Sequence, residues 1–186
     1  ENALSEFASL YESESQQMMA NKLGLLEFGS RDKELLDGLE KVLSLAETDM
    51  TLFYRGLAEA TEEMTPTARF NCLHDAFYTE SELTDPVTNE ILRWLGDYLQ
   101  RVSTDDVSDQ QRRDRMNQVN PLYVLRNYRA QLAIDAAGQG DFSAVDELLE
   151  VLRNPYTRQQ DRDEYAAKRP EWARHRVGCS MLSCSS

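Results

Sequence analysis

The apolar and polar positions along this chain follow a helical pattern almost throughout. In most segments apolar residues recur at steps of three and four, the period of an amphipathic helix. No segment shows the two-residue alternation that is typical of a half-buried strand. The sequence therefore predicts an all-α fold, an irregular bundle of seven or eight helices with an extended C-terminal tail.

Capping residues, glycines and prolines divide the pattern into separate helices. Ser30 is expected to cap the second helix and Asp49 to start the third, because both side chains accept hydrogen bonds from free N–H groups of a first turn. The pair Thr65-Pro66 breaks the chain, and Thr84-Asp85-Pro86 opens the clearest helix. The expected segments lie at about 3–22, 30–46, 49–60, 66–77, 84–102 and 108–117.

A further pair of helices is expected after residue 119. Asn120-Pro121 should open the first of them, and Gly138 and Gly140 should end it. The second should start at Asp141 or Ser143 and stop before Asn154-Pro155. The side chains expected to face inward are Val124, Leu125, Tyr128, Leu132 and Ala136 in the first helix, and Val145, Leu148, Leu149 and Leu152 in the second.

The sequence favours a division into a helical region, residues 1–155, and a tail, residues 156–186. The tail is charged, weakly periodic and interrupted by proline, so at most one short helix is expected in it, near residues 161–168. Residues 177–186 are rich in glycine and serine, and a mobile terminus is expected there.

The charge of the chain excludes several classes of function. Its net charge is -13, which argues against nucleic-acid binding, since that needs a basic footprint. No apolar run approaches the ~18–20 residues of a membrane span, and the acidic N-terminal stretch does not resemble a signal peptide. We therefore expect a cytoplasmic protein that binds neither nucleic acid nor membrane.

That charge is also distributed unevenly. Residues 1–109 carry 8 Lys and Arg against 23 Asp and Glu, whereas residues 110–186 carry 12 against 10. Five arginines lie close together in the second part and are suited to binding phosphate or an acidic surface. The competing interpretation is that they pair with Asp109, Asp114 and Asp135 or pack against another domain. These arginines are Arg112, Arg113, Arg115, Arg126 and Arg129.

The run Gly138-Gln-Gly140-Asp-Phe142 invites two functional interpretations. A phosphate-binding glycine loop should follow a strand, yet this run follows a predicted helix and lacks the third glycine. A kinase Asp-Phe-Gly would need glycine where Ser143 stands. A joint between two helices, with Gly at the end of one and Asp capping the next, explains the run better.

Cysteines and histidines supply the ligand types that zinc prefers, but not its usual spacing. Cys72 and His74 are only two positions apart, and the set near the C-terminus would need a distant fourth ligand. We therefore expect no metal site, and Cys72 is expected to be a small buried apolar residue. The candidate ligands are Cys72, His74, His175, Cys179 and Cys184.

Cys184 is third from the end of the sequence, where only Ser185 and Ser186 follow it. A thiol on a Gly- and Ser-containing terminus can reach another thiol without distorting a core. In a reducing compartment such a thiol is better suited to a redox switch than to a structural bridge. An incidental terminal cysteine is the competing interpretation.

Two runs of the sequence are the most specific: Asn120-Pro-Leu-Tyr-Val-Leu-Arg-Asn127 and the ending Gly178-Cys-Ser-Met-Leu-Ser-Cys-Ser-Ser186. Together with several other runs, they resemble the C-terminal half of the selenoprotein O family. The resemblance covers essentially the whole chain, although the acidic helices before residue 110 are less specific. Further matching runs are Asn21-Lys-Leu-Gly-Leu25, Arg115-Met-Asn-Gln-Val119, Tyr128-Arg-Ala-Gln-Leu-Ala-Ile134, Gly140-Asp-Phe142 and Pro170-Glu-Trp-Ala173.

The resemblance implies a protein adenylyltransferase with a kinase-like fold, which transfers AMP from ATP to Ser, Thr or Tyr of target proteins with Mg²⁺ or Mn²⁺. The family's nucleotide, metal and catalytic motifs belong to an upstream kinase-like domain, and none of them matches here. The resemblance therefore implies that these 186 residues hold no catalytic, cofactor-binding or metal-binding residue and are inactive alone.

One functional position carries over by resemblance. Many eukaryotic members have selenocysteine third from the C-terminus, bacterial members have cysteine, and Cys184 occupies that position. The resemblance implies a disulfide with a cysteine of the kinase-like domain, with Cys179 as a possible accessory thiol. The alternative function is a stand-alone helical interaction module that docks through its acidic face or its arginines, and the upstream reading frame would discriminate the two.

Overall fold

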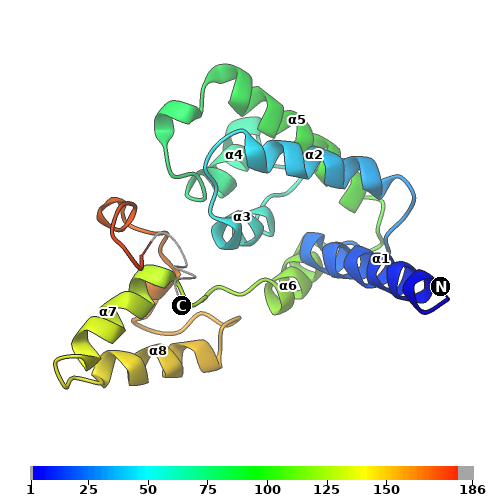
Figure 1. Ribbon diagram of the computed structural model, residues 1–186. Coiled ribbons are helices and arrows are strands. Elements are labelled where there is room, and N and C mark those ends of the chain that lie inside the picture. The colour runs from blue at the N-terminus through cyan, green and yellow to red at the C-terminus, as the bar shows by residue number, and fades with distance from the viewer. Residues whose placement is uncertain (1, 180–186) are drawn as a thin grey trace. The chain divides into compact units, whose positions relative to one another are not determined.

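The computed structural model describes residues 2–179, with side chains from Glu6 onward, and this part of the chain is helical (Figure 1). Between residues 2 and 179 there is no strand, only an isolated bridge between Thr48 and Phe77, so the all-α prediction is confirmed. The α-helices are α1 Asn2–Leu23, α2 Asp32–Ser44, α3 Met50–Leu57, α4 Pro66–His74, α5 Asp85–Val102, α6 Asp109–Val119, α7 Asn127–Ala137, α8 Ser143–Arg153 and α9 Asp163–Ala166. Two 3-10 helices, η1 Glu80–Glu82 and η2 Glu171–Ala173, complete the described elements.

The chain forms two compact units, Glu1–Asn120 and Pro121–Ser186. In the first, α2 packs on α5, α4 packs on both α3 and α5, and α6 packs on α1 and α3. No helix in the described part is long and apolar enough to cross a membrane.

The core of the first unit is built around α5, the helix whose start the sequence predicted most clearly. Ile91, Leu95 and Leu99 are buried together with Phe53 and Leu57 of α3. These side chains are removed from water, which supplies the main stabilising term of the unit. The indole of Trp94 and the hydroxyl of Tyr98 are buried and donate to the carbonyls of Leu35 and Leu23, as low-dielectric burial requires.

Gly56 allows α3 and α4 to approach closely. A Cβ at this position would lie inside the contact distance of the Cys72 carbonyl oxygen, so no side chain fits. Gly24, with φ at +74°, ends α1 in the left-handed region that glycine adopts readily.

Three of the predicted helix starts, at Asp49, Thr65 and Ser108, are confirmed by side-chain caps. The Asp49 carboxylate accepts from the Leu52 N–H, and Ser108 forms a capping box with Gln111. The expected Ser30 cap is wrong, because Arg31 occupies that position without a side-chain cap. The Asp32 carboxylate, in the first turn of α2, instead accepts from the Gly29 N–H at 2.7 Å.

The second unit is a hairpin of α7 and α8, onto which the following residues fold back. Its main cluster buries Leu122, Tyr123, Val151, Tyr165 and Ala166. The single turn of α9 lies within the predicted range 161–168. The assignment of 1–155 and 156–186 as functional domains stays a prediction.

The expected helix start at Asn120-Pro121 is wrong, since α7 begins only at Asn127. Asn120 closes α6, and its side-chain amide donates to the Lys22 carbonyl at 2.9 Å. The N–H groups of Leu122 and Tyr123 donate to the Pro155 carbonyl at 2.7 and 3.0 Å. These distant partners hold residues 121–126 out of the helix that their local signals predict.

The inward face predicted for this hairpin is only partly correct. Tyr128 is buried, and Leu148 and Leu152 pack against Val151. The other apolar side chains expected to face inward include four that are exposed: Leu125, Leu132, Val145 and Leu149. This exposed set gives the hairpin an apolar outer surface.

Candidate functional site

Arg112 is the most buried of the five clustered arginines, with 2% of its surface exposed. Its guanidinium donates to the Tyr98 hydroxyl at 3.0 Å, to the Ala60 carbonyl at 2.6 Å and to Asp109 at 3.2 Å. The pairing expected with Asp109 is therefore present. Because both terminal nitrogens of its guanidinium already have partners inside the unit and the side chain is buried, Arg112 is a structural residue and offers little to a ligand.

Neighbouring arginines of α6 also bind within their own unit. Arg113 pairs with Glu59 at 3.1 Å, and Arg115 donates to the Gly24 carbonyl at 2.6 Å. The Asp114 carboxylate, expected as an arginine partner, accepts from Gln110 at 2.8 Å. The three arginines of α6 therefore do not form a shared anion site.

In the second unit, Arg129 donates to both the carbonyl and the carboxylate of Glu164, at 2.8 and 3.0 Å. Its guanidinium also lies over the Tyr165 ring, 4.6 Å from the centroid. Burial opposes the charged form of Arg129, while the hydrogen bond to Glu164 favours it, and the net result is a raised pKa. Arg129 therefore joins the tail to α7.

Residues 138–142 form the joint between α7 and α8. The Gly138 N–H donates to the Ile134 carbonyl as the helix ends, and Gly140 has φ at +89°. The Asp141 carboxylate accepts from the Ser143 N–H at 3.0 Å, and hydrogen bonds from Ser143 lower the pKa of Asp141. These residues do not fit a phosphate-binding loop, because the run continues a helix. The expected N-cap role of Asp141 is wrong, since Phe142 holds that position, although the Asp141 carboxylate accepts from the N–H of the first residue of α8.

The candidate zinc ligands are not assembled. No group of three or more His, Cys, Asp or Glu side chains with metal-binding geometry occurs in the part of the chain that the structure describes. The Nε2 of His74 lies 2.9 Å from the Glu80 carboxylate. Cys72 is half-buried, and its Sγ lies 3.4 Å from the Ala68 carbonyl oxygen. Burial, with a smaller contribution from Glu59, raises the pKa of the Cys72 thiol.

Of the two redox candidates, Cys184 lies outside the described residues. Cys179 is buried in a small cluster with Tyr128 and Ala173, and it is a free thiol. His175, the remaining zinc candidate, is exposed.

Cys179 is held by contacts that fasten the tail to α7, which sequence reasoning missed. Arg176 pairs with Asp135 at 2.5 Å, and Gln131 donates to the same carboxylate at 2.8 Å. Gly178 has φ at +80°, and a Cβ there would overlap the Gln131 side chain. We call these four residues the tail clamp; the i, i+4 spacing of Gln131 and Asp135 is its one readable signal.

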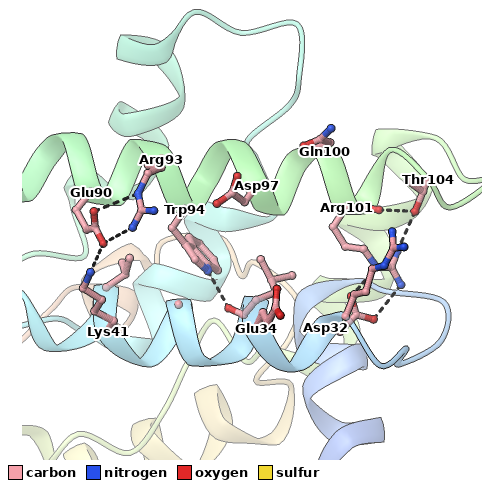
Figure 2. A pocket seen from close by; sticks show the side chains of 14 residues that line it. Asp32, Glu34, Lys41, Glu90, Arg93, Trp94, Asp97, Gln100, Arg101 and Thr104 are labelled. Atoms are coloured by element: carbon pink, nitrogen blue, oxygen red, sulfur yellow. Dashed lines mark hydrogen bonds and ion pairs between the residues drawn. The ribbon is translucent and has the colours of Figure 1, made fainter.

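A groove of about 570 Å³ lies between α2 and α5 of the first unit (Figure 2). The indole N–H of Trp94 donates to the Leu35 carbonyl across its floor at 3.0 Å. At one end Lys41 and Arg93 both bind Glu90, each at 2.5 Å, and these hydrogen bonds lower the pKa of Glu90.

At the other end of the groove, Arg101 bridges two carboxylates. It lies 2.6 Å from Asp32 and 2.9 Å from Asp105, and the hydrogen bond to Asp32 raises the pKa of Arg101. In Figure 2 Lys41 points across the groove to Glu90 at one end, and Asp32 points to Arg101 at the other. Since these cations are matched by carboxylates of the same groove, it does not have the excess positive charge that ATP would need.

The fold and the charged clusters together define the class of protein region: the described part is all-helical, and its charged side chains mainly stabilise the packing of its own helices. The sequence matches the family described as Protein adenylyltransferase SelO over residues 1–153, and the chain belongs to this family. A protein nucleotidyltransferase YdiU of Rhodopirellula baltica is 54% identical over 180 residues, an alignment that covers 91% of this chain and 33% of the relative.

Two further YdiU nucleotidyltransferases align with the whole chain. That of Xanthomonas oryzae pv. oryzae is 46% identical and that of Flavobacterium johnsoniae is 42% identical, with 35% and 36% of the relative covered. The chain therefore spans about a third of the length of the curated relatives it matches.

Proposed function

We propose that this chain is the helical C-terminal region of a protein adenylyltransferase, which in its full-length form transfers AMP from ATP to Ser, Thr or Tyr of target proteins. The observation that carries the proposal is the family match over residues 1–153 in a chain that spans only about a third of its relatives. The printed names of those relatives describe them as protein nucleotidyltransferases.

The chemistry of this proposal belongs to a kinase-like domain outside these 186 residues, where ATP and Mg²⁺ or Mn²⁺ would bind. Two observations support this assignment. Arg112, Arg115 and Arg129 already bind backbone carbonyls or carboxylates of their own unit. The run from Gly138 to Asp141 joins two helices and presents no free row of N–H groups to a phosphate. The chain alone is therefore expected neither to bind ATP nor to transfer AMP.

We assign a redox role in regulation to Cys184, with Cys179 as an accessory thiol. The tail clamp supports this role, because it fastens the chain to α7 next to Cys179. Cys184 follows Cys179 by five positions in the sequence. Five extended residues span at most about 18 Å. A partner thiol in the kinase-like domain would therefore have to lie within about that distance, plus the side chains, of Cys179.

Both described cysteines, Cys72 and Cys179, are free thiols. A regulatory disulfide of Cys184 would suit a reducing compartment, so we also propose a cytoplasmic location for the full-length enzyme.

The alternative is a stand-alone helical interaction module that docks through its acidic face or its arginine cluster. The structure weakens the second of these docking surfaces, because Arg112 is buried and Arg113 and Arg115 bind within the unit. A reading frame that continues upstream into a kinase-like segment would eliminate the alternative.

The proposal is tested by titrating Mg²⁺-ATP into the 186-residue chain and, side by side, into the full-length protein. Calorimetry should show saturable binding to the full-length protein and no binding heat for the chain. Saturable binding to the chain alone would contradict the assignment of the nucleotide site to another domain.

A further inference from the structure

The N-terminal half of α1 extends beyond the core of its unit. Residues 6–14 are exposed on every side of the helix, whereas Ala20 and Leu23 are fully buried. In Figure 1 the C-terminal half of α1 lies beside α6, and the half toward the N mark lies beyond it. An isolated helical segment of this length is only marginally stable in water, because most helix stability in proteins comes from tertiary packing.

This half of α1 carries an exposed apolar stripe. Phe7 and Tyr11 are 65% and 67% exposed, and their rings stack with centroids 6.3 Å apart. Leu10 and Met18 are exposed beside them. Positions 7, 11 and 18 share one face of a helix, so the stripe is continuous along it. Contiguous exposed apolar surface of this kind marks an interaction site.

The stripe continues onto α6 through a shallow hollow. Met18 lines a cavity of about 340 Å³ together with Val119, and Val119 is itself exposed. Glu14 lines the same cavity, and position 14 lies on the same helix face as positions 7, 11 and 18 of the stripe. We call this surface, which consists of Phe7, Leu10, Tyr11, Glu14, Met18 and Val119, the α1 face.

The charge around the α1 face restricts what can cover it. Glu6, Glu12 and Glu14 are the charged residues between positions 6 and 21, and the first cation after them is Lys22. Lys22 lies 4.2 Å above the Tyr54 ring of its own unit. A second copy of the chain would place the same carboxylates opposite Glu14, and like charges repel. The covering surface should therefore be apolar with Lys or Arg opposite Glu14.

We propose that the α1 face docks against the part of the full-length protein that lies outside this chain, on an apolar surface with a basic residue beside Glu14. This inference rests on the proposed function, which makes the chain one region of a longer enzyme. The length outside is large, since the chain covers only 33–36% of its relatives. Docking would bury the stripe and supply the tertiary packing that residues 6–14 lack within their own unit.

The test compares hydrogen exchange at residues 6–14 in the full-length protein and in the 186-residue chain. Exchange should be at least tenfold slower in the full-length protein, while the core of α5 exchanges equally slowly in both. Equal exchange at residues 6–14 would overturn the proposal. So would protection in the chain alone that increases with concentration, because it would identify a second copy as the occupant.

A pair of substitutions in the full-length protein locates the docked face. Tyr11→Lys should abolish the slow exchange of residues 6–14, and Ser13→Lys, on the opposite side of the same helix turn, should leave it intact. Phe7→Ala serves as a milder variant if Tyr11→Lys prevents folding. Equal effects of the Tyr11 and Ser13 substitutions would overturn the assignment of the face.

Binding of Mg²⁺-ATP is measured on the same full-length preparation. A protein that binds ATP but leaves residues 6–14 unprotected would refute the docking and leave the proposed function intact. A full-length protein that does not bind ATP would refute the proposed function, whatever the exchange rates show.

Discussion

The Arg112 guanidinium donates a hydrogen bond to the Tyr98 hydroxyl at 3.0 Å, and that hydroxyl donates to the Leu23 carbonyl at 2.9 Å. Arg112 also donates to the Ala60 carbonyl, just beyond α3. One buried chain of hydrogen bonds thus connects α6, α5, the end of α1 and the segment after α3. In a low-dielectric interior such a network is strong when complete and destabilising when broken.

Arg112→Ala is expected to lower the free energy of unfolding of the 186-residue chain by about 3 kcal/mol, because it leaves buried acceptors without donors. Urea unfolding followed by circular dichroism measures the change. Arg113→Ala removes only a partly exposed pair with Glu59 and should change stability by less than about 1 kcal/mol. Equal losses in the two variants would show that the Arg112 network adds no particular stability.

Tyr98 gives the fold a predictable sensitivity to high pH. Burial raises the pKa of Tyr98 from 10.0 to about 12. The unfolded chain releases this proton near pH 10 while the folded chain keeps it, so the stabilising contribution is complete below pH 10 and is lost as pH rises toward 12. In that window Tyr98 alone should lower the free energy of unfolding by up to about 1.4 kcal/mol per pH unit.

Comparing variants isolates this contribution from other groups that titrate at high pH. Urea midpoints from pH 9 to 12 should fall less steeply for Tyr98→Phe than for the wild-type chain, although Tyr98→Phe is less stable at pH 9. Tyr11→Phe, at an exposed position, should keep the wild-type slope. A wild-type slope in Tyr98→Phe would mean that the buried phenol does not titrate as proposed.

Two helix glycines should respond in opposite ways to alanine. Gly56→Ala forces a methyl group against the Cys72 backbone and should destabilise the chain by about 2 kcal/mol or more. Gly96 lies within α5 with nothing within 4 Å of its missing Cβ, so Gly96→Ala should stabilise by about 0.5–1 kcal/mol. Thermal unfolding midpoints of both variants, compared with that of the wild-type chain, measure these changes. An unchanged midpoint for Gly56→Ala would refute the close approach of α3 and α4.

Sequence patterns predicted those parts of the fold whose signals are local. The α5 helix has a proline in its first turn and an unbroken apolar stripe, and both features are confirmed. The start of α7 was missed because residues 122 and 123 bond to Pro155, more than thirty positions away. A local proline signal contains no information about such a partner.

The candidate sites show the same division between local and tertiary information. Arg112 was expected either to bind phosphate or an acidic surface, or to pair with a nearby aspartate or pack against another domain. Its burial depends on carbonyl groups of residues 57 and 60, which only the tertiary fold brings to it. The joint between α7 and α8, in contrast, was predicted from its local glycines and aspartate, although Phe142 and not Asp141 occupies the N-cap position of α8.

The tail clamp predicts how accessible Cys179 is to a thiol reagent. Gly178→Ala would place a methyl group against Gln131 on a backbone with φ at +80°, so residues 176–179 should detach from α7. Peptide-level mass spectrometry with a maleimide should show Cys179 labelled about tenfold faster, which corresponds to about 1.4 kcal/mol in the opening equilibrium.

Two matched variants make this last prediction specific to the clamp. Asp135→Asn removes the charge that Arg176 meets at a half-exposed position and should raise the labelling rate by no more than about fivefold. Gly140→Ala also strains a glycine of positive φ, but no atom lies within 4 Å of its Cβ, and it should leave Cys179 labelling unchanged. If both glycine variants accelerated labelling equally, the unit would be loosening as a whole. Acceleration by Gly178→Ala but not by Gly140→Ala would show that the clamp controls access to Cys179, which is the described cysteine closest to Cys184 in the sequence.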